Sequence, residues 1–203
     1  MGKLMKRVLA VALFVAFFWC GMLIGDKVAL RSELIRLHVV ADSDSGEDQA
    51  IKLRVRDAVV ESLRQGMADV QDTDQALAYL RENLPKIEAV ANETLQKLGC
   101  TDTAVVSLAE EAFPTRDYDT FSLPAGVYEA LRIVIGDGEG HNWWCVVFPK
   151  LCLTATSAEA QDTAVSAGFS QELSNTLTGE TGYEFRFFLL ECLGKIENFF
   201  HKG

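Results

Sequence analysis

The sequence predicts an α+β domain, an antiparallel sheet with helices packed on one face, preceded by an N-terminal membrane-spanning or signal segment. An apolar, β-branched run at 34–41 is followed by two stretches with helical periodicity, at 44–63 and 73–98. The chain then becomes β-rich over 103–148, and a final helical stretch follows at 184–200. Helices grouped together and followed by a meander are typical of an antiparallel sheet covered on one face.

The first 27 residues resemble an export segment. Three cations in the first seven residues precede an uncharged run of eighteen residues, 8–25, which Asp26 and Lys27 end. Cations before an apolar run keep the N-terminus cytoplasmic, so this segment would insert into the membrane. Eighteen residues are at the short end for a helix that crosses a bilayer. No small-x-small cleavage motif follows, which favours an uncleaved anchor slightly over a long signal peptide. Either way, residues 28–203 would form a single extracytoplasmic domain.

The exported part is strongly acidic. Of the 19 Lys and Arg, three lie in the leader, so residues 26–203 hold 16 against all 29 Asp and Glu, a net charge of −13. Affinity for nucleic acid depends largely on cations that neutralise phosphates. Nucleic acid is therefore not expected as a partner. Hydrophobic residues make up 49% of the chain, which is enough for a packed core.

Two apolar strands, 128–135 and 143–148, predict a central hairpin. The turn between them, 136–142, is polar and carries three alternating glycines, which suit backbone with positive φ. Further along, 169–177 predicts a short helix. The apolar stripe of 184–200 predicts a helix that docks on the sheet.

Cys145 and Cys152 flank a short apolar segment. A hairpin turning around Phe148 and Pro149 would place them opposite one another, so a disulfide and a pair of free buried thiols are both open. No spacing of Cys or His resembles a zinc site. No metal or cofactor is expected.

Asp42 and Asp44 follow the strand predicted at 34–41, as in phosphoaspartyl hydrolases, where a first Asp is the nucleophile and a second acts as acid and base. Such enzymes also need a Lys and Mg²⁺-binding acids after further parallel strands, and no βαβ succession downstream provides them. The favoured interpretation is a turn whose side chains bond backbone amides and cap the next helix. No catalytic site is expected, and the hydrolase is the alternative.

The best candidate for contact with a partner is the run His141, Asn142, Trp143 and Trp144. Successive side chains of a strand face opposite ways, so only one Trp can enter a given core and the other tends outward. An exposed Trp often dominates the energy of a protein interface. The alternative is that helices cover both faces of the sheet and bury both rings.

Two uncommon strings of residues carry a resemblance to a known family. The first runs from Ile35 to Ala41 and continues through Ser43-Asp44-Ser45, Asp48-Gln49 and most of 53–59. The second covers most of 123–152 and includes Asn142-Trp143-Trp144-Cys145-Val146. With the leader, these strings resemble the stage II sporulation protein R family of endospore-forming bacteria. Two departures are Asp42, where the family usually has Asn, and Lys150, where it often has a second Pro.

The resemblance implies an intercompartmental signal that is made in the forespore and exported into the space between the two septal membranes. There it would activate a membrane-embedded aspartic protease of the mother cell, which processes the precursor of a sporulation sigma factor. The implied partner is that protease, and the N-terminal helix would tether the chain if it is not cleaved. An Asn at position 42 in relatives also weakens the hydrolase alternative, because an amide is no nucleophile.

Overall fold

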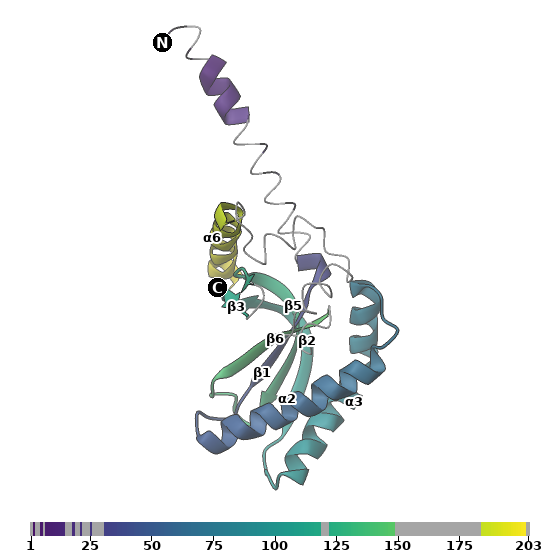
Figure 1. Ribbon diagram of the computed structural model, residues 1–203. Coiled ribbons are helices and arrows are strands. Elements are labelled where there is room, and N and C mark those ends of the chain that lie inside the picture. The colour runs from purple at the N-terminus through teal and green to yellow at the C-terminus, as the bar shows by residue number, and fades with distance from the viewer. Residues whose placement is uncertain are drawn as a thin grey trace.

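The computed structural model describes residues 31–118, 122–148 and 184–201, together with residues 2, 5, 7–14, 18, 21 and 25. Two long helices, α2 (Gly46–Gly66) and α3 (Thr73–Lys97), lie together over one side of a sheet, and a third helix, α6 (Glu184–His201), lies apart from them (Figure 1). The predicted α+β class is confirmed.

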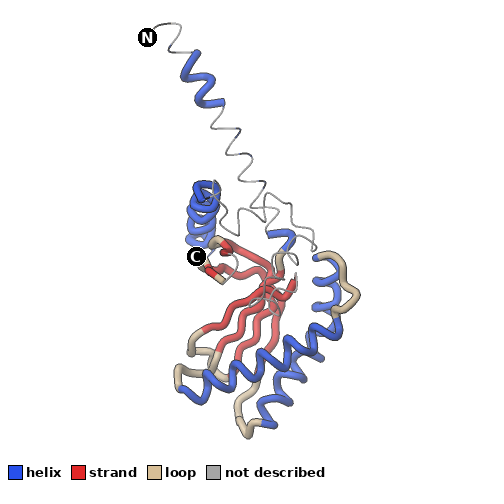
Figure 2. The backbone as a smooth tube through the Cα atoms, viewed as in Figure 1, coloured by secondary structure: helices blue, strands red, loops and turns tan. Residues whose placement is uncertain are grey.

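The main sheet has four strands and is mixed (Figure 2). Their order across the sheet is β2 (Ala104–Phe113), β5 (Gly126–Ile135), β1 (Ile35–Val40) and β6 (Asn142–Phe148). β1 runs parallel to β5 and antiparallel to β6, whereas β2 runs antiparallel to β5. Two short strands, β3 (Arg116–Asp117) and β4 (Ser122–Leu123), pair with each other beside this sheet.

The predicted central hairpin is wrong, because β1 lies between its two strands. Val39 of β1 pairs with Ile133 of β5 on one side and with Trp143 of β6 on the other. Every residue of β1 is buried, which suits a central strand covered on both faces. The sheet is therefore mixed, and the prediction of an antiparallel sheet is wrong.

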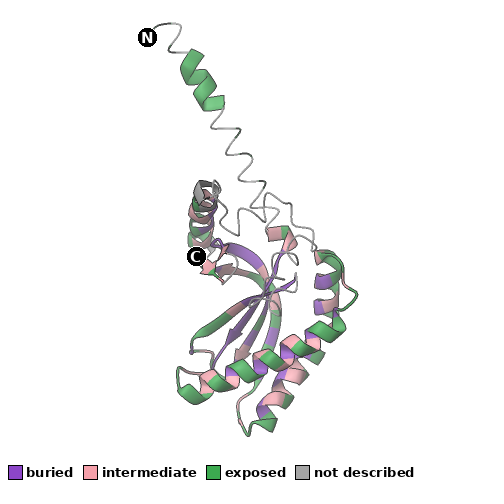
Figure 3. Cartoon of the chain, viewed as in Figure 1, coloured by how far each residue is buried: buried purple, intermediate pink, exposed green. Residues whose placement is uncertain are grey.

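Each face of the sheet has its own apolar core, so the prediction that helices cover one face is also wrong. Buried residues follow the strands of the sheet and recur along the long helices (Figure 3). The first core joins β1, β5 and β6 to the inner faces of α2 and α3 through side chains such as Leu37, Val59 and Leu80. The second core lies on the opposite face and includes Phe113, Tyr128 and Leu190 of α6.

The docking of α6 on the sheet, which the sequence predicted, is confirmed by three close contacts. Asn198 donates to the backbone oxygen of Phe113 at 2.7 Å, and Glu197 accepts from the backbone N–H of Val127 at 3.3 Å. A Cβ added at Gly194 would lie 1.6 Å from the backbone oxygen of Ala125, so only glycine allows this approach.

The helix ends largely follow the sequence. Ser45 caps α2 by accepting from the backbone N–H of Asp48 at 3.0 Å. The cap of α3 is Asp72, which accepts from the backbone N–H of Gln75 at 2.8 Å. Pro85 lies inside a continuous α3, and Gly99 follows that helix with a φ of 73°.

One edge of the sheet is bonded by helix side chains. Asn92 of α3 donates to the backbone oxygen of Ala104 at 2.9 Å and accepts from its N–H at 2.8 Å. Glu88 accepts from the N–H of Val106 at 3.0 Å. At the start of β2, three backbone groups are therefore bonded by side chains of α3.

The helix predicted at 169–177 and Cys152 lie outside the described residues. In the part of the chain that the structure describes, no helix combines the length and the apolar character needed to cross a bilayer.

Candidate partner-contact site

The predicted contact run begins in the turn between β5 and β6, which is bonded to the turn between β1 and α2. Gly140 donates to the backbone oxygen of Ala41 at 3.0 Å, and Glu139 donates to that of Asp42 at 2.9 Å. A Cβ added at Gly140 would lie 2.3 Å from the backbone oxygen of Ser43. The β5–β6 turn is therefore fixed in place by close backbone contact with the start of the first helix.

Asp42 helps to hold the same turn. Its carboxylate accepts from the backbone N–H of Asp137 at 2.6 Å. Gly136 and Gly138 have φ angles of 57° and 68°, which confirms the prediction of positive φ at those two positions. A Cβ at Gly136 would also strike the Asp42 carboxylate.

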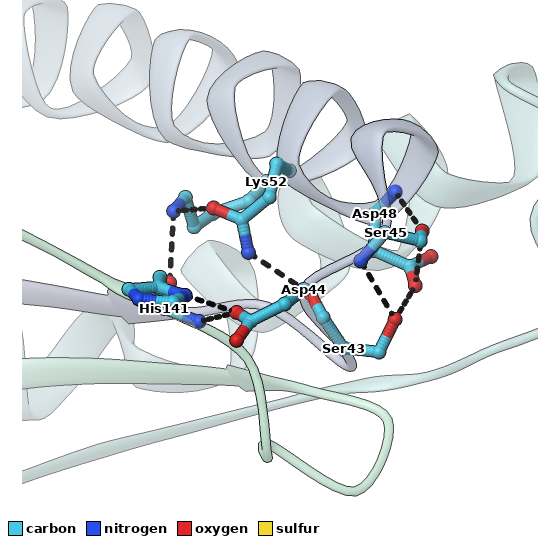
Figure 4. Close-up of polar contacts among 7 residues, drawn as sticks. Ser43, Asp44, Ser45, Asp48, Lys52 and His141 are labelled. Carbon is cyan, nitrogen blue, oxygen red and sulfur yellow. Dashed lines mark hydrogen bonds and ion pairs between the residues drawn. The ribbon is translucent and has the colours of Figure 1, made fainter.

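His141 is held from two sides (Figure 4). The carboxylate of Asp44 accepts from the backbone N–H of His141 at 2.6 Å and also bonds its imidazole Nδ1. The Nζ of Lys52, which is only 4% exposed, donates to the backbone oxygen of His141 at 2.8 Å. The main chain of His141 is thus fixed while its ring lies in solvent.

Two groups at this turn have shifted pKa values. The hydrogen bond from the His141 side chain, followed by that from its backbone, lowers the pKa of Asp44. Burial lowers the pKa of Lys52. Because 79% of the His141 side chain and 55% of the Asp44 side chain are exposed, solvent screens this pair and it adds little to stability. Its main effect is to set the position of the turn.

The two tryptophans face opposite sides of the sheet, as strand alternation predicts. Trp143 lies against α2, with the Arg56 guanidinium 4.3 Å from its ring centroid, and 38% of the residue is exposed. Trp144 is half-buried on the other face, where the Arg116 guanidinium lies 3.7 Å from its ring centroid. Neither ring is fully buried, and cation–π contact with an arginine holds each of them.

Asn142 is tied to a buried histidine. His38 of β1 is 7% exposed, and its Nε2 lies 2.8 Å from the Asn142 Oδ1. Its Nδ1 lies 2.7 Å from a carboxylate oxygen of Glu111, and its ring stacks on Trp144 with centroids 5.7 Å apart. The structure therefore brings the four predicted contact residues together at the start of β6, and each of them has a polar or ring contact with a residue of β1 or α2.

The sequence analysis missed His38 and Arg36 as parts of this region. Both lie between apolar residues of strand β1, and both are buried. A cation or an imidazole in a strand buried on both faces must find partners, which is the signal that could have identified them.

The residues of the hydrolase alternative have structural partners. Asp42 and Asp44 both accept backbone hydrogen bonds from the β5–β6 turn, and β1 has a single parallel neighbour in the sheet. Asp42, Asp48 and Asp102 place carboxylate oxygens within 4.8 Å of one another, an oxygen set of the kind that divalent cations take. The pKa of Asp48 is lowered by hydrogen bonds from the hydroxyls of Ser43 and Ser45.

Cys145 is disulfide-bonded, whereas Cys100 and Cys192 are free thiols. The proposed partner of Cys145, Cys152, lies outside the described residues, so this pairing stays a prediction.

Two comparisons identify relatives of this chain. The family model described as "Stage II sporulation protein R (spore_II_R)" matches residues 31–158. A Bacillus subtilis (strain 168) protein named "Stage II sporulation protein R" is 32% identical over 222 residues, which cover 95% of this chain and 99% of that protein. No solved structure matches the chain.

Proposed function

Because the chain belongs to the stage II sporulation protein R family and so has a role in sporulation, we propose that it acts as an exported ligand. In this proposal it activates a membrane-embedded aspartic protease, which then processes the precursor of a sporulation sigma factor. The activation requires contact between the two proteins and no chemistry by the chain itself.

Membership of this family carries the proposal, because the family model matches residues 31–158 and the Bacillus subtilis relative aligns with 95% of the chain. The cationic start and the uncharged run of the first 25 residues support export. The family is not named as a family of enzymes. The exposed His141 ring at the end of the turn and the partly exposed Trp143 in the adjoining strand β6 support recognition by protein contact.

Co-expression in a non-sporulating host tests the proposal. The protease and the precursor are produced with and without this chain, and cleavage of the precursor is scored on blots. We expect cleavage only when the chain is present. Equal cleavage in its absence, or none in its presence, would refute the proposed activation.

A reporter fusion tests export separately. An enzyme that is active only outside the cytoplasm is fused to Gly203, and its activity is compared with that of a matched cytoplasmic reporter. We expect activity from the first fusion alone. The reverse result would remove the premise that the chain acts beyond the membrane.

A further inference from the structure

Two arginines lie close together on the second face of the sheet, and neither forms an ion pair with an acid of the described residues. Arg36 of β1 is fully buried, and two of its nitrogens, Nε and Nη1, have no hydrogen-bond partner. Arg116 of β3 is half-buried, and its Nε is also buried without a partner. Two unpaired cations are unexpected in a domain with a net charge of −13, where acids are abundant.

Aromatic rings surround both guanidinium groups. That of Arg36 lies 4.2 Å from the ring centroid of Phe113 and donates to the hydroxyl of Tyr118 at 3.0 Å. That of Arg116 lies on the ring of Trp144 at 3.7 Å. These contacts hold the two groups in position, but rings and a hydroxyl do not neutralise a buried charge.

The two cations also repel one another. Burial lowers the pKa of Arg116, and the positive charge of Arg36 lowers it further. An anion bound at the half-buried guanidinium of Arg116 would offset this repulsion. A carboxylate matches the planar guanidinium fork, which binds it through two parallel hydrogen bonds.

We propose that Arg36 and Arg116 form a binding site for a carboxylate, and that this carboxylate belongs to an acidic side chain of the protein that the chain activates. The inference rests on the proposed function for the source of the carboxylate, but not for the site itself. Trp and Arg are the residues that most often anchor protein interfaces, which favours a protein ligand. Trp144 belongs to the contact run, so the site extends that surface onto the second face.

The site is tested first without any partner. Full-length protein in detergent micelles is titrated with a blocked glutamate, N-acetyl-glutamate methylamide, while the indole N–H signals are followed by NMR. We expect a saturable shift at Trp144 and none at Trp143. The glutamine analogue should produce no shift, and Arg116→Gln should abolish the one caused by glutamate. An equal shift with the glutamine analogue, no shift at all, or tighter binding of inorganic phosphate would overturn the carboxylate site.

The source of the carboxylate is tested in the co-expression assay. We expect Arg116→Gln to lower precursor cleavage by at least about tenfold, the loss typical of an anchoring arginine. The matched control is Arg54→Gln, which neutralises an exposed arginine of α2 and should leave cleavage unchanged. Normal cleavage with Arg116→Gln, in a protein that binds the blocked glutamate, would overturn the assignment to the partner. If the wild-type chain does not activate precursor cleavage, only the proposed function is refuted. The NMR titration with blocked glutamate still decides whether the carboxylate site exists.

A second variant guards against an effect on folding. Arg36→Met replaces an unpaired buried charge with an apolar side chain of similar length. We expect a higher melting temperature together with a weaker shift at Trp144. A lower melting temperature would show that Arg36 serves the fold and would overturn its place in the site.

Discussion

The carboxylate of Asp44 bonds both the backbone N–H and the imidazole of His141, a residue 97 positions later in the chain. This contact joins the turn before α2 to the turn before β6. The contact fixes the main chain of His141, the first residue of the contact run, while the His141 ring stays exposed.

Asp44→Ala should loosen this turn with little loss of stability, because the contact between Asp44 and the His141 ring is exposed to solvent. We expect faster hydrogen exchange at the His141 amide and weaker precursor cleavage. Asp44→Asn retains an oxygen acceptor and should behave more like the wild type. Since the folded pKa of Asp44 is lowered, its stabilising contribution is present above about pH 4 and is lost as the pH falls further. Unchanged exchange in the Ala variant would contradict this role.

Trp143→Ala should reduce precursor cleavage by about tenfold or more while lowering the free energy of unfolding only slightly, since the ring is 38% exposed. Trp144→Ala removes a half-buried ring and should cost more, about 1–3 kcal/mol. Val105→Ala, which shortens a 61% exposed side chain on β2, is the matched control. Export is measured for each variant. Normal cleavage with both Trp variants would exclude the contact role.

Gly140→Ala should destabilise the domain by about 1–3 kcal/mol, because the added Cβ meets the backbone oxygen of Ser43 at 2.3 Å. Gly46→Ala is the control, since a Cβ there has no heavy atom within 4 Å and lies in the first turn of α2. It should be neutral or slightly stabilising. Urea denaturation compares the two. A Gly140→Ala protein as stable as the wild type would show that the turn moves freely.

Tyr128 should make the protein sensitive to high pH. Burial raises the pKa of Tyr128 to about 12, from an ordinary value of 10.0. Its contribution to stability is therefore complete below pH 10 and is lost between pH 10 and 12, at about 1.4 kcal/mol per pH unit. Tyr128→Phe should remove that part of the pH dependence. At neutral pH it should cost about 1 kcal/mol, because the hydroxyl donates to Pro124 at 2.9 Å. Urea denaturation from pH 8 to 11 measures both effects.

Asp42→Asn should retain full precursor cleavage. The amide oxygen can still accept from the N–H of Asp137, and the change relieves repulsion among three close carboxylates. A phosphoaspartyl hydrolase would lose its nucleophile by the same substitution. Loss of cleavage in a stably folded Asn variant would therefore revive the hydrolase alternative.

The sequence predicted the helices and most strands, because these depend on local periodicity and capping residues such as Ser45. It did not predict the neighbours of each strand. The glycine-rich turn at 136–142 suggested that the strands on either side of it pair as a hairpin. Strands that are apolar on both faces carry no pattern that specifies a neighbour, and in the structure β1 lies between these two strands.

The same limit applies to the contact region. Alternation correctly placed Trp143 and Trp144 on opposite faces. The partners of each ring come from distant parts of the chain, Arg56 in α2 and Arg116 in β3. Such pairings depend on the arrangement of the whole sheet, and no local spacing in the sequence encodes them.

The side chains of Glu88 and Asn92 give the protein protection against self-association. An uncovered strand edge is a template on which a further chain can add, and successive additions lead to fibres. The two backbone groups of Ala104 and the N–H of Val106 are already bonded by α3, so a second chain cannot pair with them. An edge that is closed in this way suits the ligand role proposed above, in which the chain must stay free to meet its target.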